Sequence, residues 1–140
     1  MSEFVVDASV SIKWFLPEIH YIPARNLLSG FHFLMVPDLF FPEFGDILWK
    51  KVGRDELSDA EAREVLAALL TIGLRTVSSE HLLSHALEIA LETECTVYDA
   101  LYLALAATHD IALVTADRRL YDRIRIGPLM PHVLWVEDVK

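Results

Sequence analysis

Four acidic residues stand in strongly apolar sequence, where a charge is costly. They are Asp7 in FVVDASV, Glu43 in PDLFFPEFGDIL, Asp99 in TVYDALYLALA and Asp117 in IALVTAD. Helix capping or the helix dipole gives Asp7, Glu43 and Asp99 an ordinary structural use, because acids are favourable at helix N-termini. Capping does not explain why four acids share surroundings in which desolvating a carboxylate costs free energy.

Carboxylates gathered in one crevice raise one another's pKa and oppose folding unless a cation lies between them. Oxygen ligands favour hard cations, so Mg²⁺ or Mn²⁺ is the expected ion. A metal-activated water can then attack a phosphodiester while the ion stabilises the developing charge. The four acids are far apart in the sequence, and spacing alone does not establish that they meet.

The elements that position these acids alternate between strand and helix. Apolar runs predict strands over residues 4–6, 32–36, 74–77, 111–115 and 132–136. Helical patterns cover 23–29, 39–52, 80–92 and 97–108, and the capping box SDAE at 58–61 begins a further helix that ends by Gly73. This order predicts an α/β fold, a three-layer α/β/α arrangement around a mostly parallel five-stranded sheet.

In such sheets, function lies beyond the carboxyl ends of the strands, where the strand order reverses. Asp7 follows the first expected strand and Asp117 follows the fourth. If the strand order is 3-2-1-4-5, these two strands are neighbours and both carboxylates reach one crevice.

Length and composition limit the number of domains and the class of protein. The chain has 140 residues, of which 54% are hydrophobic, so we expect one globular domain over residues 1–140. No apolar run reaches the length of a membrane span, and the N-terminus lacks a secretory signal pattern. Cys95 is the only cysteine, which excludes an internal disulfide, and we expect a cytoplasmic protein.

The net charge is −9, which repels nucleic acid at long range. Any action on nucleic acid therefore needs a metal ion or local basic charge. Basic residues do cluster, at Arg118, Arg119, Arg123 and Arg125, and again at Lys13, Lys50, Lys51 and Arg54. These clusters are either solvated faces paired with nearby acids such as Asp122 or contacts for nucleic acid, and the residues alone leave both readings open.

Four stretches of the chain resemble the sequence blocks of PIN-domain ribonucleases and, more narrowly, of the VapC toxins of VapBC toxin–antitoxin pairs. They are VVDASVSIKWFLPE, PDLFFPEFGDILWK, TVYDALYLALA and LVTADRRLY, and together they span nearly the whole chain in the family's order. The resemblance implies catalytic residues that hold the divalent metal, namely Asp7, Glu43, Asp99 and Asp117. It also implies that Thr115 supplies a hydroxyl to the site, with Ser9 nearby.

The resemblance further implies an endoribonuclease that cuts RNA, a homodimer and a cognate antitoxin that blocks the site. One position departs from the family's pattern, because the usual Glu-x-x-Asn is Glu43 followed by Asp46. Asp46 then either assists metal binding or faces solvent.

Two other functions fit part of the sequence pattern. A receiver-type signalling domain is also a five-stranded α/β unit, but it needs an aspartate after the third strand, where this chain has VSSE. An inert PIN-like binding module remains a second possibility, and the intact set of four acids argues against it.

Overall fold

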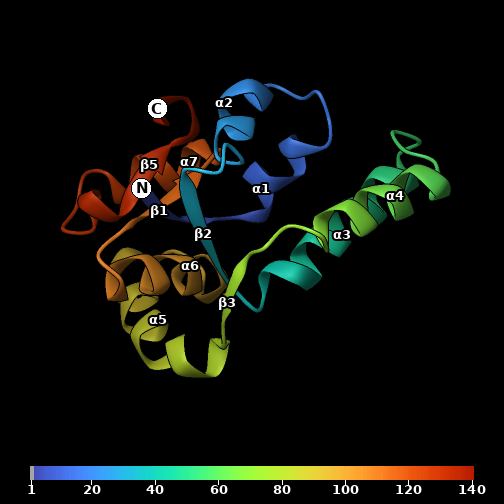
Figure 1. The fold of residues 1–140 in the computed structure, drawn as a ribbon. Helices are drawn as coiled ribbons and strands as arrows, with labels where there is room; N and C mark the ends of the chain where they lie inside the picture. The colour runs from blue at the N-terminus through green and yellow to red at the C-terminus, as the bar shows by residue number, and fades with distance from the viewer. Residues whose placement is uncertain (1) are drawn as a thin grey trace.

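The computed structural model describes residues 2–140 and contains five strands flanked by helices (Figure 1). In chain order, the strands and α-helices are β1 (Ser2–Val6), α1 (Ala8–Ser11), α2 (Tyr21–Asn26), β2 (His32–Pro37), α3 (Phe40–Gly53), α4 (Asp59–Leu69), β3 (Arg75–Val77), α5 (Ser79–Thr93), α6 (Val97–Thr108), β4 (Ala112–Thr115), α7 (Arg118–Ile124) and β5 (Val133–Trp135). Three short 3₁₀ helices complete it: η1 (Ile12–Trp14), η2 (Met130–His132) and η3 (Val136–Asp138).

All five strands are parallel, in the order β3-β2-β1-β4-β5. Val5 lies opposite Met35 of β2 on one side and Leu113 of β4 on the other. The expected fold class and strand order are confirmed. β1 and β4 are neighbours at the centre of the sheet, and the strand order changes direction between them. Their carboxyl ends therefore open onto the same crevice.

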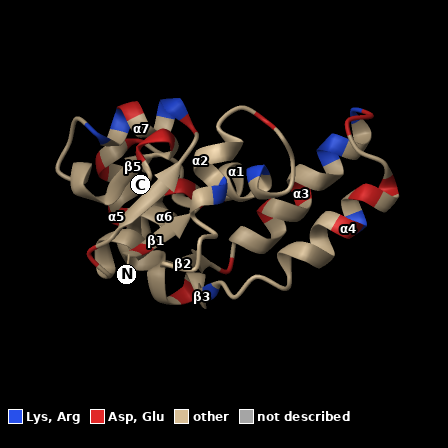
Figure 2. Cartoon of the chain, turned by 45° about the horizontal axis from the view of Figure 1, so that its top comes forward, with Lys and Arg blue, Asp and Glu red and all other residues tan. Residues whose placement is uncertain are grey.

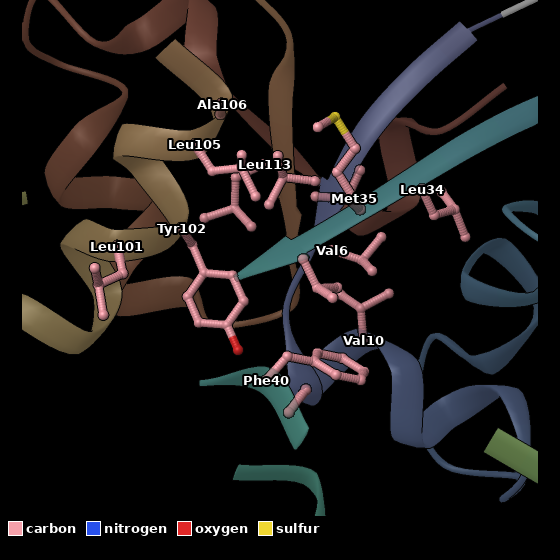
Figure 3. Close-up of a cluster of buried hydrophobic side chains, with 14 of the residues drawn as sticks. Val6, Val10, Leu34, Met35, Phe40, Leu101, Tyr102, Leu105, Ala106 and Leu113 are labelled. Carbon is pink, nitrogen blue, oxygen red and sulfur yellow. The ribbon is translucent and has the colours of Figure 1, made fainter. Parts of the chain in front are cut away.

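The helices cover both faces of the sheet. Figure 1 shows α5 and α6 on one side and α1, α2 and α7 on the other, while α3 and α4 run alongside each other and extend away from the sheet. α6 is buried along its length from Ala100 to Ala106, which confirms the expectation from its all-round apolar sequence. Figure 3 shows Leu105 of α6 beside Leu113 of β4 in the core, and the Tyr102 hydroxyl pointing away from these side chains.

Local sequence signals explain where several helices begin. Ser58 and Glu61 form the expected capping box at the start of α4, with Ser58 N–H donating to the Glu61 carboxylate at 2.9 Å. Thr96 caps α6, accepting from the N–H of Asp99 at 3.1 Å. The helix expected over 97–108 has these bounds in the structure, and the one expected over 23–29 is displaced to Tyr21–Asn26. Within residues 2–140, no helix combines the length and apolar character that a membrane crossing requires.

Candidate active site

The four acids meet because four separate elements end or begin at one edge of the sheet. Asp7 follows β1, Asp117 lies just beyond β4, and Val6 and Val114 are register partners in those two strands. Glu43 comes from the first turn of α3 and Asp99 from the first turn of α6. Residues far apart in the sequence are thereby placed around one crevice.

A cavity of about 280 Å³, which we call the acidic cavity, is bounded by all four carboxylates. Its lining residues are Asp7, Ala8, Ser9, Glu43, Asp46, Ile47, Lys50, Asp99, Tyr102 and Asp117. The structure therefore brings together every acid expected at the site. Their role as catalytic residues stays a prediction.

Asp7 is held by three hydrogen bonds that use both carboxylate oxygens. Oδ1 accepts from Ser9 Oγ at 2.6 Å and from the Val10 N–H at 3.0 Å, and Oδ2 accepts from Thr115 Oγ1 at 2.8 Å. Burial nevertheless raises the pKa of Asp7 to about 6, with a further contribution from the charge of Asp99, because these bonds offset only part of the desolvation. Asp7 caps α1 as well, so the ordinary use of this residue and its place in the cavity coexist.

Glu43 and Asp99 show the same electrostatic signature. Burial is the main cause that raises the pKa of each, and neighbouring carboxylates add to it: Asp7 and Asp99 for Glu43, and Asp117 for Asp99. Glu43 accepts a 2.5 Å hydrogen bond from the hydroxyl of Tyr102. The acids repel one another across the cavity, which is how carboxylates behave when no cation balances them.

Thr115 forms hydrogen bonds with two of the acids from a position outside the cavity lining. It is fully buried and does not line the cavity. Its hydroxyl donates to Asp7 and accepts from the N–H of Asp117 at 3.0 Å. Asp117 in turn caps α7, accepting from the N–H groups of Arg119 and Leu120. Thr115 thus positions carboxylates, whereas Ser9 both holds Asp7 and lines the cavity.

Asp46, the position that departs from the family's pattern, is exposed and lines the cavity's rim. Its carboxylate forms an ion pair of 3.0 Å with Lys50, one helical turn further along α3. The acid that this departure adds is therefore partly balanced by a nearby cation.

Tyr102 is a residue of the site that was not among those expected from the sequence. It is buried, and its hydroxyl holds Glu43 across 59 residues of sequence. The available signal was its spacing, because it lies three residues after Asp99 on the same face of α6.

The basic cluster near the C-terminus divides into two parts. Arg118 and Arg125 pair with Asp122, at 3.6 and 3.2 Å, as a solvated face would. Arg119 and Arg123 instead line a second cavity of about 320 Å³, which shares Asp99 and Asp117 with the acidic cavity. The solvated-face reading therefore fits Arg118 and Arg125, and contact of Arg119 and Arg123 with nucleic acid stays a prediction.

The acidic cavity fits a hard divalent cation by its chemistry. The candidate metal ligands in its lining are carboxylate and hydroxyl oxygens, which Mg²⁺ and Mn²⁺ prefer, and the repulsion between the carboxylates is the condition that a cation relieves. As the side chains lie, no three His, Cys, Asp or Glu residues of the described part of the chain are grouped closely enough to hold an ion.

Comparison with known proteins agrees with this geometry. The PIN domain family model matches residues 4–126. Ribonuclease VapC3 of Pyrobaculum aerophilum is 34% identical over 123 residues, which cover 86% of this chain and 94% of that protein. The crystal structure of PAE2754 from the same organism has a TM-score of 0.73 and 26% identity, covering 97% of this chain and 85% of that one.

A toxin–antitoxin complex from Klebsiella pneumoniae contains a chain with the same fold, with a TM-score of 0.63 at 15% identity, covering 93% of this chain and 94% of that one. The family match spans the acids of the cavity, and the relatives extend over most of the chain. This chain therefore belongs to the PIN-domain family and, within it, to the VapC ribonucleases of VapBC toxin–antitoxin systems.

Proposed function

We propose that this chain cleaves RNA phosphodiester bonds in the acidic cavity with a bound Mg²⁺ or Mn²⁺, as the toxin of a toxin–antitoxin pair. One observation carries the proposal: four carboxylates from four different elements line one cavity, and burial together with the charges of neighbouring acids raises the pKa values of Asp7, Glu43 and Asp99. A fold does not keep such repulsion for its stability, because unpaired buried charges cost free energy.

Asp7, Glu43, Asp99 and Asp117 would hold the ion, which supplies a positive charge opposite the phosphate and acidifies a water molecule. The remaining residues orient these ligands. Ser9 and Thr115 fix both oxygens of Asp7, and Tyr102 fixes Glu43. Hydrogen bonds of this kind keep carboxylates in one orientation and limit the rearrangement needed during the reaction.

The partner would be an antitoxin, as in the Klebsiella pneumoniae complex with the same fold. An acidic toxin suits a basic antitoxin segment, because opposite charges speed and orient the encounter. We propose a cytoplasmic location, because a toxin that cleaves cellular RNA meets its substrate there.

We also propose a homodimer, supported by an apolar stripe on α5. Leu83, Leu87 and Leu91 recur every four residues along this helix and are 51%, 50% and 75% exposed. Side chains at this spacing form one face of a helix, and an exposed apolar face favours association. Light scattering with Leu87→Glu beside the parent protein tests it: a dimer that Leu87→Glu dissociates is expected, and a parent protein that stays monomeric at every concentration contradicts it.

Metal dependence is tested with purified protein and a panel of RNAs. Cleavage is expected to stop in excess chelator, to return with Mg²⁺ or Mn²⁺, and to be lost in Asp99→Asn. Glu92→Gln removes one exposed charge on α5, at a residue that does not line the acidic cavity, and serves as the matched control. Cleavage that persists in chelator and in Asp99→Asn contradicts the metal mechanism, and a parent protein that cleaves no RNA favours an inert binding module.

A further inference from the structure

A third cavity lies beside the acidic one, between the α1–η1 segment and α3, and it is basic. Its volume is about 230 Å³. The lining residues of this basic cavity are Ser9, Ile12, Lys13, Glu18, Ile47, Lys50, Lys51 and Arg54. Four of these side chains are cations and one is an anion, in a chain whose net charge is −9. Figure 2 shows blue ribbon near α1 and along α3, within a molecule whose exposed helices carry much red.

Lys13 is the most unusual of the four cations, because it is only 7% exposed. Its Nζ lies 3.5 Å from Glu18 Oε1, while the Nζ of Lys51 contacts the other oxygen of the same carboxylate. One carboxylate therefore faces two ammonium groups that are both largely withdrawn from water. A buried ion pair needs only one cation per carboxylate, and a second one costs desolvation energy that an additional anion would offset.

The two other cations lie on the open side of the basic cavity. Lys50 is exposed and is already paired with Asp46. Arg54, at the end of α3, is exposed and forms no ion pair within the described residues. It is therefore available to an incoming anion without giving up a partner.

The basic cavity adjoins the acidic cavity directly, because Ser9, Ile47 and Lys50 line both. A nucleic-acid strand carries its phosphates at short, regular intervals. A strand whose cleaved phosphate lies at the acids can therefore place a neighbouring phosphate among the lysines. This adjacency favours a phosphate of the substrate over an acidic side chain of a protein partner as the missing anion.

We propose that Lys13, Lys51 and Arg54 form a phosphate-binding subsite that holds a nucleotide flanking the cleaved bond of the RNA substrate. The inference rests on the proposed ribonuclease function and adds how the substrate strand is positioned. The ammonium and guanidinium groups donate charge-assisted hydrogen bonds to phosphate oxygens, which are stronger than bonds between neutral groups. The subsite also explains how so acidic a protein attracts RNA, since its cations are concentrated beside the reacting bond.

The first test measures RNA binding, which does not depend on cleavage. A labelled single-stranded RNA of about ten nucleotides is titrated in Mg²⁺ against protein carrying Asp99→Asn, so that the RNA stays intact. Arg54→Gln and Lys51→Gln are added to this background, and Arg75→Gln on β3 removes one exposed positive charge that lines none of the three cavities. Arg54→Gln disturbs no ion pair of the described residues, so we expect this variant to fold like the parent protein.

We expect each subsite substitution to weaken binding about tenfold and to make the negative slope of log K against log salt shallower by about one, as the loss of one phosphate contact does. Arg75→Gln should change neither. A merely structural Lys13–Glu18–Lys51 cluster predicts a lower melting temperature for Lys51→Gln but an unchanged salt slope for Arg54→Gln. RNA affinities and salt slopes equal to those of the Arg75→Gln protein overturn the proposal. The proposal is also overturned if the subsite variants bind RNA as the background protein does and lose only the binding of an acidic protein partner.

The second test identifies the phosphate. In an RNA whose cleaved bond has been mapped with the parent protein, each flanking phosphate is replaced in turn by a neutral methylphosphonate. At one flanking position, the replacement should lower kcat/KM in the parent but cause no further loss in Lys51→Gln, because the contact is already gone. Equal losses in both proteins at every position overturn the subsite while leaving the ribonuclease intact. Conversely, binding that responds to the subsite variants without any cleavage would sustain the subsite and remove the proposed function.

Discussion

Asp7 and Glu18 are partly buried carboxylates in the first segment of the chain, but their electrostatic surroundings are opposite. Glu18 faces two lysines, and its interactions with Lys51 and Lys13 together outweigh its burial and hold its pKa below the usual range. Asp7 faces other acids, and burial raises its pKa to about 6 although three hydrogen bonds oppose the shift. One site is electrostatically satisfied within the fold, and the other is left unsatisfied.

The two sites show that the charge of Glu18 stabilises the fold, whereas the charge of Asp7 belongs to the proposed reaction site. Glu18 connects the loop after η1 to α3 through Lys51, so its charge contributes to stability. The charge of Asp7 destabilises the fold in the absence of a cation, and hydrogen bonds that keep it oriented do not remove that cost. Carboxylates with raised pKa values that share a cavity are typical of functional sites.

The largest expected effect is on activity. Asp7→Asn should lower RNA cleavage by at least about 100-fold, because the proposed metal loses a charged ligand while the amide keeps the size and the helix cap. In chelator, the same variant should melt at the parent's temperature or several degrees higher, since a buried charge is removed. Cleavage assays and melting curves on one preparation measure both. If the variant melts several degrees lower and retains activity, Asp7 is a structural cap alone.

The same acid-to-amide change at Glu18 should lower stability, whereas at Asp7 it should preserve or raise stability in chelator. Glu18→Gln leaves Lys13 and Lys51 without their carboxylate, and we expect the free energy of unfolding to fall by about 2 kcal/mol, less than for a fully buried pair because the Glu18 side chain is 29% exposed. Urea unfolding measures the change. Glu92→Gln, an exposed acid on α5, is the control and should be nearly neutral. A neutral Glu18→Gln would remove the contrast between the two sites.

The pH dependence of stability should also have opposite signs at the two sites. The folded pKa of Asp7, about 6, exceeds its ordinary value of 3.8, so the folded protein binds more protons between these values. Metal-free stability should therefore rise as pH falls from about 6 towards 4, by on the order of 2 kcal/mol from this group. Glu18, whose pKa is lowered, loses its contribution only as pH falls below its ordinary 4.5.

Melting curves in chelator across this range test the pH prediction, with Asp7→Asn as the reference. The variant should lack the rise that is assigned to Asp7. A parallel rise in both proteins would assign it to Glu43 and Asp99 instead, whose pKa values are also raised.

The smallest expected effect comes from removing the support of Asp7 rather than Asp7 itself. Thr115→Val deletes the hydroxyl that donates to Asp7 and accepts from the N–H of Asp117. We expect about a tenfold loss of kcat and about 1 kcal/mol of stability, because a backbone N–H loses its acceptor. Thr115→Ser keeps the hydroxyl and should restore most of both. Equal losses in the two variants would indicate that the methyl group, not the hydroxyl, is what matters.

Much of the fold was predictable because its signals are local. The capping box at Ser58 and Glu61 and the apolar helix Val97–Thr108 depend on residues within a few positions of one another. The alternation of strands and helices predicted the parallel sheet. The short helix α1 carries no periodic apolar pattern in its four residues, and it depends on the cap that Asp7 supplies.

The sequence by itself determined which acids are present and that each stands where a charge is costly. Only the tertiary structure decided their meeting, because the strand order places β1 beside β4 and so brings Thr115 to Asp7 across 108 residues. It also decided that Lys13 and Lys51 share Glu18, which no local spacing indicates. Helix caps and apolar periodicity act between neighbours in the chain, whereas cavities and shared ion pairs form where crossovers bring distant segments together.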